Sequence, residues 1–199
     1  MAFDITGFRH AMHYDGQRPN LFQVTVADKA NIFNGTDLNL FAKATSIPGA
    51  VIGTVIVPYF GREVKMAGNR TFPEWTVTVI NDENFAIRSQ FEMWMNKINN
   101  HSANFRQGSS STDYTSTAKV KQFSKNTNTS AEYGFVNIFP TDLSEITLDW
   151  GDNDTIEEYT VTFAYDYWTR VAGSASGGSG VVADDIEFDD IEGLSLIHI

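Results

Sequence analysis

Residues 158–168 alternate regularly between large apolar and smaller polar side chains. This period of two predicts a β-strand that buries one of its faces. The buried face would carry Tyr159, Val161, Phe163, Tyr165 and Tyr167. The same period recurs over 72–80 and, more weakly, over 21–27. Because several half-buried strands must pair and cover one another, we expect a mainly β chain of two packed antiparallel sheets, arranged as a sandwich or barrel.

One segment has helical periodicity instead. Its apolar side chains recur three or four residues apart at Ile87, Phe91, Trp94 and Ile98. That spacing predicts a single flanking α-helix of about four turns, with its apolar stripe packed on the core. We expect Asn81 or Asp82 to cap its start and Asn99-Asn100 to end it.

The remaining elements are predicted from shorter patterns. Further strands are expected at 41–47, at 118–123, at 134–139 with Pro140 as its end, and, from a weak alternation, over 143–150. The segments 102–117 and 124–132 are polar and poor in apolar residues, so we expect loops there.

The segment 52–68, IGTVIVPYFGREVKMAG, is apolar on both faces of the strand that it predicts. Ile52 and Ile56 fall on one face, and Val55 and Val57 fall on the other. Pro58 favours an edge strand or a strand end, and the later Gly68-Asn69 is predicted to form a turn. A small domain has little surface with which to cover two apolar faces. The segment is therefore either an internal core strand or a projecting hairpin that is covered by another molecule.

Composition limits the classes of function. The chain has 199 residues, 42% of them hydrophobic, and a net charge of −11. Six acidic side chains and no Lys or Arg lie within 181–199, which leaves −5 for the rest. A body of this charge lacks the basic surface that binds nucleic acid through phosphates. No cysteine occurs, which excludes disulfides and thiol chemistry and fits a reducing cytoplasm. We expect no membrane anchor and no signal peptide.

No residue pattern predicts an active site, a metal or a cofactor. His10 and His13 form a pair without further ligands nearby, and His101 has no identifiable partner. Carboxylates crowd the range 149–158, but without the spacing of a calcium loop, so we interpret this range as an acidic turn before a strand. Nucleophile-elbow, Walker and dinucleotide glycine patterns are absent from the sequence. Catalysis is therefore unsupported.

The composition changes after residue 171. We expect one domain over 1–171, a flexible Gly/Ser linker over 172–180 and an acidic, disordered tail over 181–193. The last residues, 194–199, match a translated transposase end sequence used in DNA library preparation, and we interpret them as a sequencing artefact.

Several separate motifs occur in an order that resembles one known family. They are Ser46-Ile47-Pro48-Gly49, Pro58-Tyr59-Phe60-Gly61-Arg62, Arg70-Thr71-Phe72, Trp75-Thr76-Val77-Thr78, Phe139-Pro140-Thr141, Leu148-Asp149-Trp150 and Val161-Thr162-Phe163. Across about residues 3–170 the chain resembles the tail tube protein of contractile-tailed bacteriophages, a family related to type VI secretion and tailocin tube proteins. The linker and acidic tail depart from the resemblance.

The resemblance implies a structural role and not catalysis. Members of this family form hexameric rings that stack into a hollow tube inside a contractile sheath. The implied partners are further copies of the chain, the sheath protein, the tape-measure protein, the baseplate and the tail terminator. Genome passes through the tube, and an acidic body predicts passage without tight DNA binding. The implied location is the virion tail, assembled in the bacterial host cytoplasm.

A closed ring needs one surface patch that fits a different patch on the neighbouring subunit. We expect the segment 50–68 to supply one such patch, with Arg62 and Glu63 on its polar side. The alternative remains an internal core strand. The predicted interface residues are Ile52, Val55, Val57, Tyr59, Phe60, Arg62, Glu63, Val64 and Met66.

Three other functions remain open from the sequence. The chain is alternatively the tube protein of a tailocin or of a type VI-like injection device, which neighbouring genes would distinguish from a phage. A β-sandwich module that binds a sugar or another ligand is a different class, and such a module would stay monomeric. An enzyme is the least supported class.

Overall fold

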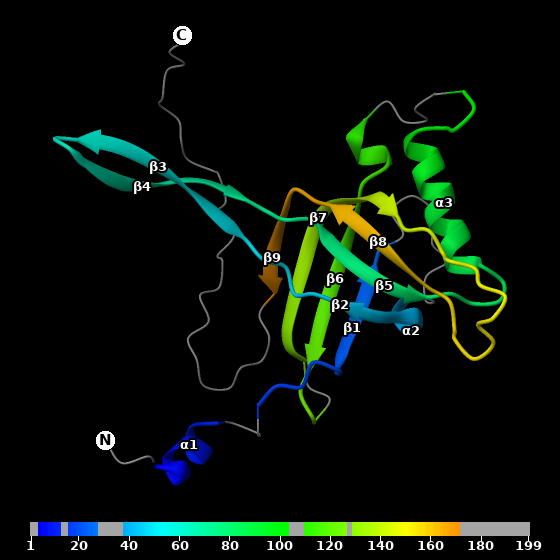
Figure 1. The fold of residues 1–199 in the computed structure, drawn as a ribbon, viewed down its shortest axis with the longest axis horizontal. Coiled ribbons are helices and arrows are strands. Elements are labelled where there is room, and N and C mark those ends of the chain that lie inside the picture. The colour runs from blue at the N-terminus through cyan, green and yellow to red at the C-terminus, as the bar shows by residue number, and fades with distance from the viewer. Residues whose placement is uncertain (1–3, 13–15, 28–37, 104–109, 127–128, 172–199) are drawn as a thin grey trace.

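The computed structural model describes residues 4–12, 16–27, 38–103, 110–126 and 129–171 (Figure 1). The elements are α1 (Ile5–Ala11), β1 (Phe22–Val26), α2 (Leu38–Phe41), β2 (Ala42–Thr45), β3 (Val51–Tyr59), β4 (Arg62–Thr71), β5 (Trp75–Ile80), α3 (Ala86–Ile98), the 3₁₀ turn η2 (Ser111–Asp113), β6 (Ser116–Phe123), β7 (Thr129–Leu143), β8 (Glu158–Ala164) and β9 (Tyr167–Val171). The predicted tail segments 172–180, 181–193 and 194–199 lie outside the described residues.

Seven strands form the body in two antiparallel layers. The hydrogen-bonded order is β1-β6-β7-β8-β5-β2, and β9 also pairs with β7. The long strand β7 joins the layers, because its first part pairs with β6 and β9 and its last part pairs with β8. The expectation of a mainly β fold with two antiparallel sheets is confirmed.

A bend in β7 lets it serve both layers. Asn137 has a φ of 55° and lies between the part of β7 that pairs with β9 and the part that pairs with β8. Its side-chain amide donates a hydrogen bond to Asp166 Oδ2 at 2.6 Å, and the Asp166 N–H donates to the carbonyl of Val136. Asp166 lies between β8 and β9, so the strand predicted over 158–168 is two strands that bend together with β7.

The core lies between the two layers. Trp75, Val77 and Val79 of β5 are buried, as the alternation over 72–80 predicts. Tyr159, Val161 and Phe163 of β8 are buried beside them, whereas Tyr167 is exposed. The Trp75 ring stacks on Phe135 of the other layer at 4.4 Å and on Phe163 at 5.3 Å. These ring contacts join the apolar faces of both layers into one core.

Helix α3 packs beside the sheet, on the side away from the hairpin of β3 and β4 (Figure 1). Ile87, Phe91 and Trp94 are buried, as predicted. The predicted cap at Asn81 or Asp82 is wrong in position, because the residue before the helix is Phe85, with a φ of 53°. The Asp82 carboxylate nevertheless accepts a hydrogen bond from the Ala86 N–H at 3.0 Å, and so satisfies one free donor of the first turn.

Four other expectations are corrected. The strand predicted to end at Pro140 continues to Leu143, because Pro140 lies at a register irregularity between β7 and β8. The weak alternation over 143–150 forms no strand beyond Leu143. The loop expected over 124–132 is shorter, because β7 begins at Thr129. The predicted loop 102–117 includes the turn η2 and the first residues of β6.

Candidate subunit interface

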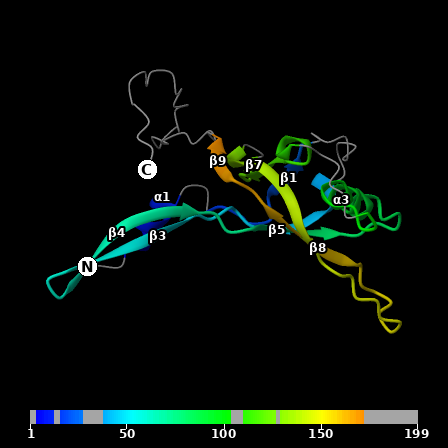
Figure 2. The same ribbon diagram turned by 90° about the horizontal axis from the view of Figure 1, so that it is seen from above.

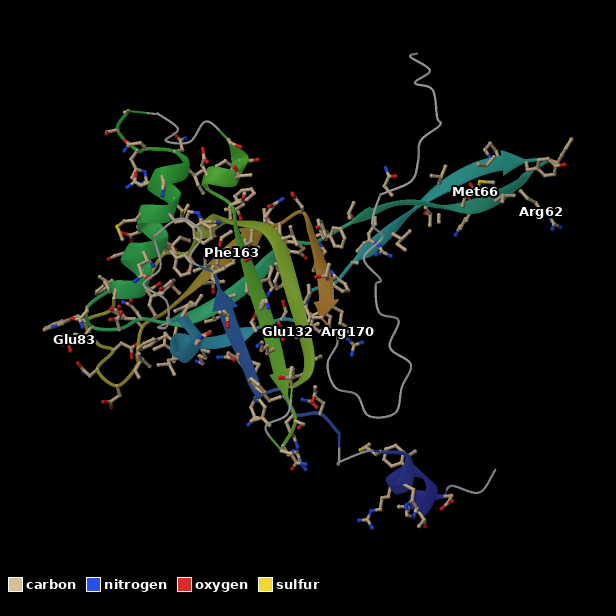
Figure 3. The ribbon with its side chains drawn as sticks, turned by 180° about the vertical axis from the view of Figure 1, so that it is seen from behind. Arg62, Met66, Glu83, Glu132, Phe163 and Arg170 are labelled. Atoms are coloured by element: carbon tan, nitrogen blue, oxygen red, sulfur yellow. The ribbon has the colours of Figure 1, made fainter. Side chains whose placement is uncertain are left out.

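Strands β3 and β4 form a two-stranded sheet of their own, separate from the body. They project from it as a long hairpin (Figures 1 and 2). Every residue of β3 is exposed, and every residue of β4 is exposed except Gly68. Figure 3 shows Arg62 and Met66 far from Phe163 in the core. The interpretation of this segment as an internal core strand is therefore wrong.

The hairpin has two faces of different character. Directly paired residues share a face, and Val55 pairs with Met66 while Val57 pairs with Val64. Tyr59 extends this apolar face toward the tip and pairs with Arg62. On the other face, Ile56 pairs with Lys65 and Pro58 pairs with Glu63. Since neighbouring residues in a strand alternate between faces, Arg62 and Glu63 lie on opposite faces, and the expectation that they share one polar side is wrong.

The tip of the hairpin is a two-residue turn with a strained aromatic residue. Phe60 and Gly61 both have positive φ, 44° and 78°. Positive φ at both central positions is the geometry of a type I′ turn, which suits asparagine or glycine and not phenylalanine. The Phe60 side chain is 91% exposed. Its ring contacts the neighbouring Tyr59 ring edge to face, with 4.7 Å between the ring centroids. The turn thus presents two aromatic rings to the surroundings.

Two tryptophans hold the chain where it enters the hairpin. The Trp75 Nε1–H donates a hydrogen bond to the Ser46 carbonyl at 3.0 Å. The Trp168 Nε1–H donates to the Gly49 carbonyl at 2.9 Å. One indole comes from β5 and the other from β9, so each layer of the body fixes one end of the Ser46–Gly49 segment. Our sequence reasoning missed this role, although Ser46-Ile47-Pro48-Gly49 directly precedes the apolar segment.

Near the end of the hairpin that joins the body, the backbones of β3 and β4 lie close together at two glycines. The register shifts between Ile52 and Thr54, so Gly53 forms an irregularity in β3. A Cβ placed on Gly68 would lie 3.1 Å from the carbonyl oxygen of Gly53, which is closer than side chains normally pack. The predicted turn at Gly68-Asn69 is therefore wrong. Both residues lie inside β4, and the glycine serves a close backbone approach instead.

The other candidate residues do not converge on a site. His10 lies on the exposed helix α1, and His13 lies outside the described residues. Among the described residues, no group of three or more His, Cys, Asp or Glu side chains could hold a metal. In that same part of the chain, no helix is long and apolar enough to cross a membrane.

The acidic range predicted as a turn is an exposed loop, residues 144–157. Its ends are fixed, because the Ser144 N–H donates to the Thr160 carbonyl and the Asn81 N–H donates to the Glu157 carbonyl. The Asp149 carboxylate accepts from the Gly151 N–H at 2.8 Å, which closes a tight turn. The loop lines an open hollow of about 540 Å³. Its apolar side chains Leu148, Trp150 and Ile156 are 78%, 101% and 70% exposed.

Comparisons with known proteins agree with this architecture. A family model described as phage tail tube protein matches residues 11–171. The tail tube protein gp19 of Enterobacteria phage T4 is 35% identical over 155 residues, which is 77% of this chain and 91% of that protein.

Two solved structures share the fold. A chain in the cryo-EM structure of the anti-feeding prophage baseplate, 6-fold symmetrised, is 12% identical with a TM-score of 0.61, over 78% of this chain and 95% of that one. A chain of an extracellular contractile injection system, the PVC sheath–tube complex in the extended state, is 19% identical with a TM-score of 0.55, over 86% and 99%. The extent of the family match and the identity to the T4 protein show that this chain belongs to the phage tail tube protein family, whose members are structural components of the viral tail.

Proposed function

We propose that copies of this chain associate into hexameric rings that stack into a hollow tube, and that the hairpin of β3 and β4 is one half of the contact that builds it. The observation that carries this proposal is the exposure of the hairpin. Val55, Val57, Val64 and Met66 form a continuous apolar face, and each is 38–55% exposed in the single chain. Exposed apolar surface of this extent marks an interaction site in soluble proteins.

The position of the hairpin fits a ring contact. A ring closes only when one patch meets a different patch on the next subunit, and a projecting arm reaches a neighbour without moving the body. The two indole bonds at Ser46 and Gly49 fix the direction of the arm. Because the hairpin is already held in one direction, it loses less conformational entropy when two subunits associate. The 6-fold symmetry of the similar baseplate structure supports six subunits per ring.

The proposed partners follow from the family and from the similar structures. A sheath protein surrounding the tube is supported by the sheath–tube complex, and contact with a baseplate is supported by the baseplate structure. A terminator at the end of the tube is supported by the similar structure of the anti-feeding prophage cap, whereas a tape-measure protein inside the tube follows from the family resemblance alone. The tube carries no catalytic group in this proposal, and it assembles in the host cytoplasm before becoming part of the virion tail.

Genome passes through this tube without tight binding. Excluding the range 181–199, the chain has a net charge of −5, so repulsion opposes stable contacts between the protein and DNA phosphates. A phage tail is supported over a tailocin or secretion device by the 35% identity to the phage T4 protein, against 12% and 19% for the similar structures. A ligand-binding β module remains the alternative in which the chain stays monomeric.

Imaging the purified full chain by negative-stain electron microscopy tests this proposal. We expect rings with six subunits and stacks of such rings. Sedimentation of the same sample should show a species about six times the mass of the chain, because closed cyclic assembly gives a defined stoichiometry. Monomers at every concentration tested would contradict the proposal and favour the ligand-binding alternative.

A further inference from the structure

We infer that the tip of the hairpin docks on the loop 144–157 of another copy of the same chain. This inference rests on the proposed self-assembly and names the surface that receives the hairpin. Both views place the loop, coloured yellow after β7, at the opposite end of the molecule from the hairpin (Figures 1 and 2). The hairpin of one chain therefore reaches a second chain and not its own loop. Two different patches at opposite ends suit a heterologous contact that repeats.

The loop offers apolar side chains that are left exposed by the described part of the chain. Leu148, Trp150 and Ile156 are each at least 70% exposed, and all three line the hollow of about 540 Å³. The hairpin tip offers the aromatic rings of Tyr59 and Phe60. The lining combines these three apolar side chains with polar and acidic ones, and aromatic side chains that fill such a hollow are typical anchors of protein interfaces. The pairing of these two surfaces buries the largest exposed rings of both.

Charge distinguishes this acceptor from other apolar patches. The loop 144–157 carries five carboxylates and no Lys or Arg. The hairpin range 51–71 carries three basic residues, Arg62, Lys65 and Arg70, and one acidic residue, Glu63. The two surfaces therefore attract each other, which steers association and fixes which patches meet. Helix α1 also exposes two apolar side chains, Ile5 and Phe8. The charged or titratable residues beside them are Asp4, Arg9 and His10, so this patch has no comparable excess of acidic side chains.

The loop is held in place before any contact forms. Its two ends are bonded to Thr160 and Asn81, and the Arg88 guanidinium donates to the Ser144 carbonyl at 3.2 Å. The Asn81 side-chain amide also donates to Glu157 Oε2 at 2.8 Å. A loop fixed at both ends loses little conformational freedom when a partner docks.

Cysteine cross-linking tests the contact directly, because the chain has no cysteine of its own. The full chain with Phe60→Cys is combined with Leu148→Cys, Trp150→Cys or Ile156→Cys, assembled under reducing conditions and then oxidised. We expect a ladder of disulfide-linked multimers for at least one combination, since a disulfide needs Cβ atoms about 4 Å apart. Phe60→Cys alone should give no product larger than a dimer. Phe60→Cys with Phe8→Cys on α1 is the matched control.

Charge reversal provides a second, independent readout. Arg62→Glu with Lys65→Glu should lower the yield of tubes about tenfold, because the end of the hairpin then becomes acidic and is repelled by the acidic loop. Adding Asp152→Lys and Asp154→Lys to the same chain should restore the yield, which a general loss of folding would not allow.

Each result bears on one of the two claims. Intact tubes that show no ladder at any of the three loop positions, or a ladder with α1 instead, overturn the docking on the loop and leave tube assembly standing. Reversed charges that the compensating pair does not rescue also overturn it. Wild-type chains that form no rings or tubes overturn the proposed function itself.

Discussion

The indole of Trp168 donates a hydrogen bond to the carbonyl of Gly49, which joins β9 to the segment that leads into the hairpin. Gly49 lies two residues before β3, so this bond fixes the hairpin where it leaves the body. Trp75 makes the equivalent bond to Ser46 from the buried core. The direction of the proposed interface is thus determined by two side chains that do not belong to it.

Replacing Trp168 by Phe keeps an aromatic ring and removes this hydrogen bond. We expect a small loss in the free energy of unfolding of the body, about 1 kcal/mol, as for a typical hydrogen bond. Hydrogen exchange of amides in β3 and β4 should accelerate, and tube yield should fall. Trp94→Phe is the comparison, because Trp94 is buried and donates to the Tyr114 carbonyl far from the hairpin. It should lower the melting temperature without selectively loosening the hairpin. Equal effects of both variants on hairpin exchange would contradict this role of Trp168.

We expect Phe60 to destabilise the hairpin and to stabilise the contact between subunits. Phe60→Gly should stabilise the isolated hairpin by about 1 kcal/mol, because glycine adopts the positive φ without steric cost. The same variant should assemble less well, since it removes the exposed ring. Gly61→Ala is the matched variant, which keeps Phe60 but strains the turn at a φ of 78°. NMR of the hairpin and electron microscopy of the tubes measure the two effects. A Phe60→Gly chain that assembles as well as wild type would show that the ring is dispensable.

Gly68 should tolerate no side chain, whereas Gly53 should tolerate a small one. A Cβ on Gly68 meets the Gly53 carbonyl oxygen at 3.1 Å, and a Cβ on Gly53 meets the Asn69 carbonyl oxygen at 3.4 Å. Gly68→Ala is therefore expected to destabilise the hairpin by about 1–3 kcal/mol, as overpacking does. Hydrogen exchange of β3 and β4 reports this loss, while β5 and β8 should be unaffected because the hairpin lies outside the core. Comparable effects of Gly53→Ala would argue against a specific close approach at Gly68.

Much of this architecture follows from the period of the sequence, because a strand in one of two packed layers buries the face that points toward the other layer and exposes the opposite face. The predictions at β5, β8 and α3 succeed for that reason. The bend at Asn137 and Asp166 could not be predicted from the alternation. Apolar residues still occur at every second position across it, at Tyr165 and Tyr167. Long-range pairing determines that bend, and a single sequence does not show it.

The exposure of the hairpin could be predicted from the sequence, whereas its local geometry and the exposed side chains of the loop could not. Apolar residues on both faces of 52–68 indicate a segment that needs outside cover, and the hairpin is indeed exposed. The sequence Gly68-Asn69 is typical of a turn. Only the pairing of β3 with β4 shows that Gly68 instead allows the two backbones to lie close together. Trp150 and Ile156 were interpreted as part of an acidic turn and Leu148 as part of a strand over 143–150, because no short-range pattern indicates that their side chains are exposed.

Burial of a tyrosine makes the body sensitive to alkaline conditions. Burial raises the pKa of the Tyr159 hydroxyl above its usual range, and the nearby Arg88 opposes this increase. A raised pKa in the folded chain means that the unfolded chain loses its proton first. Stability is therefore full below about pH 10, the usual pKa of tyrosine, and is lost as the pH rises above it.

Tyr159→Phe should consequently move the midpoint of alkaline unfolding to higher pH. The Tyr159 hydroxyl is buried and has no hydrogen-bond partner among the described residues, so the variant should not be destabilised at neutral pH. Circular dichroism during a base titration measures the midpoint. Tyr59→Phe, at the exposed hairpin, is the control and should leave it unchanged. An identical midpoint for Tyr159→Phe and wild type would contradict this origin of alkaline sensitivity.

The central claim is that the hairpin builds the tube and does not stabilise the body. Val57→Asp combined with Phe60→Asp tests it most directly, with Leu40→Asp as a control at an exposed apolar residue of α2, 77% exposed. Electron microscopy and circular dichroism are measured on the same preparations. We predict that wild type and the Leu40 variant form rings and tubes, and that the double variant remains a folded monomer with an unchanged melting temperature. Tubes formed by the double variant, or its global unfolding, would contradict the account.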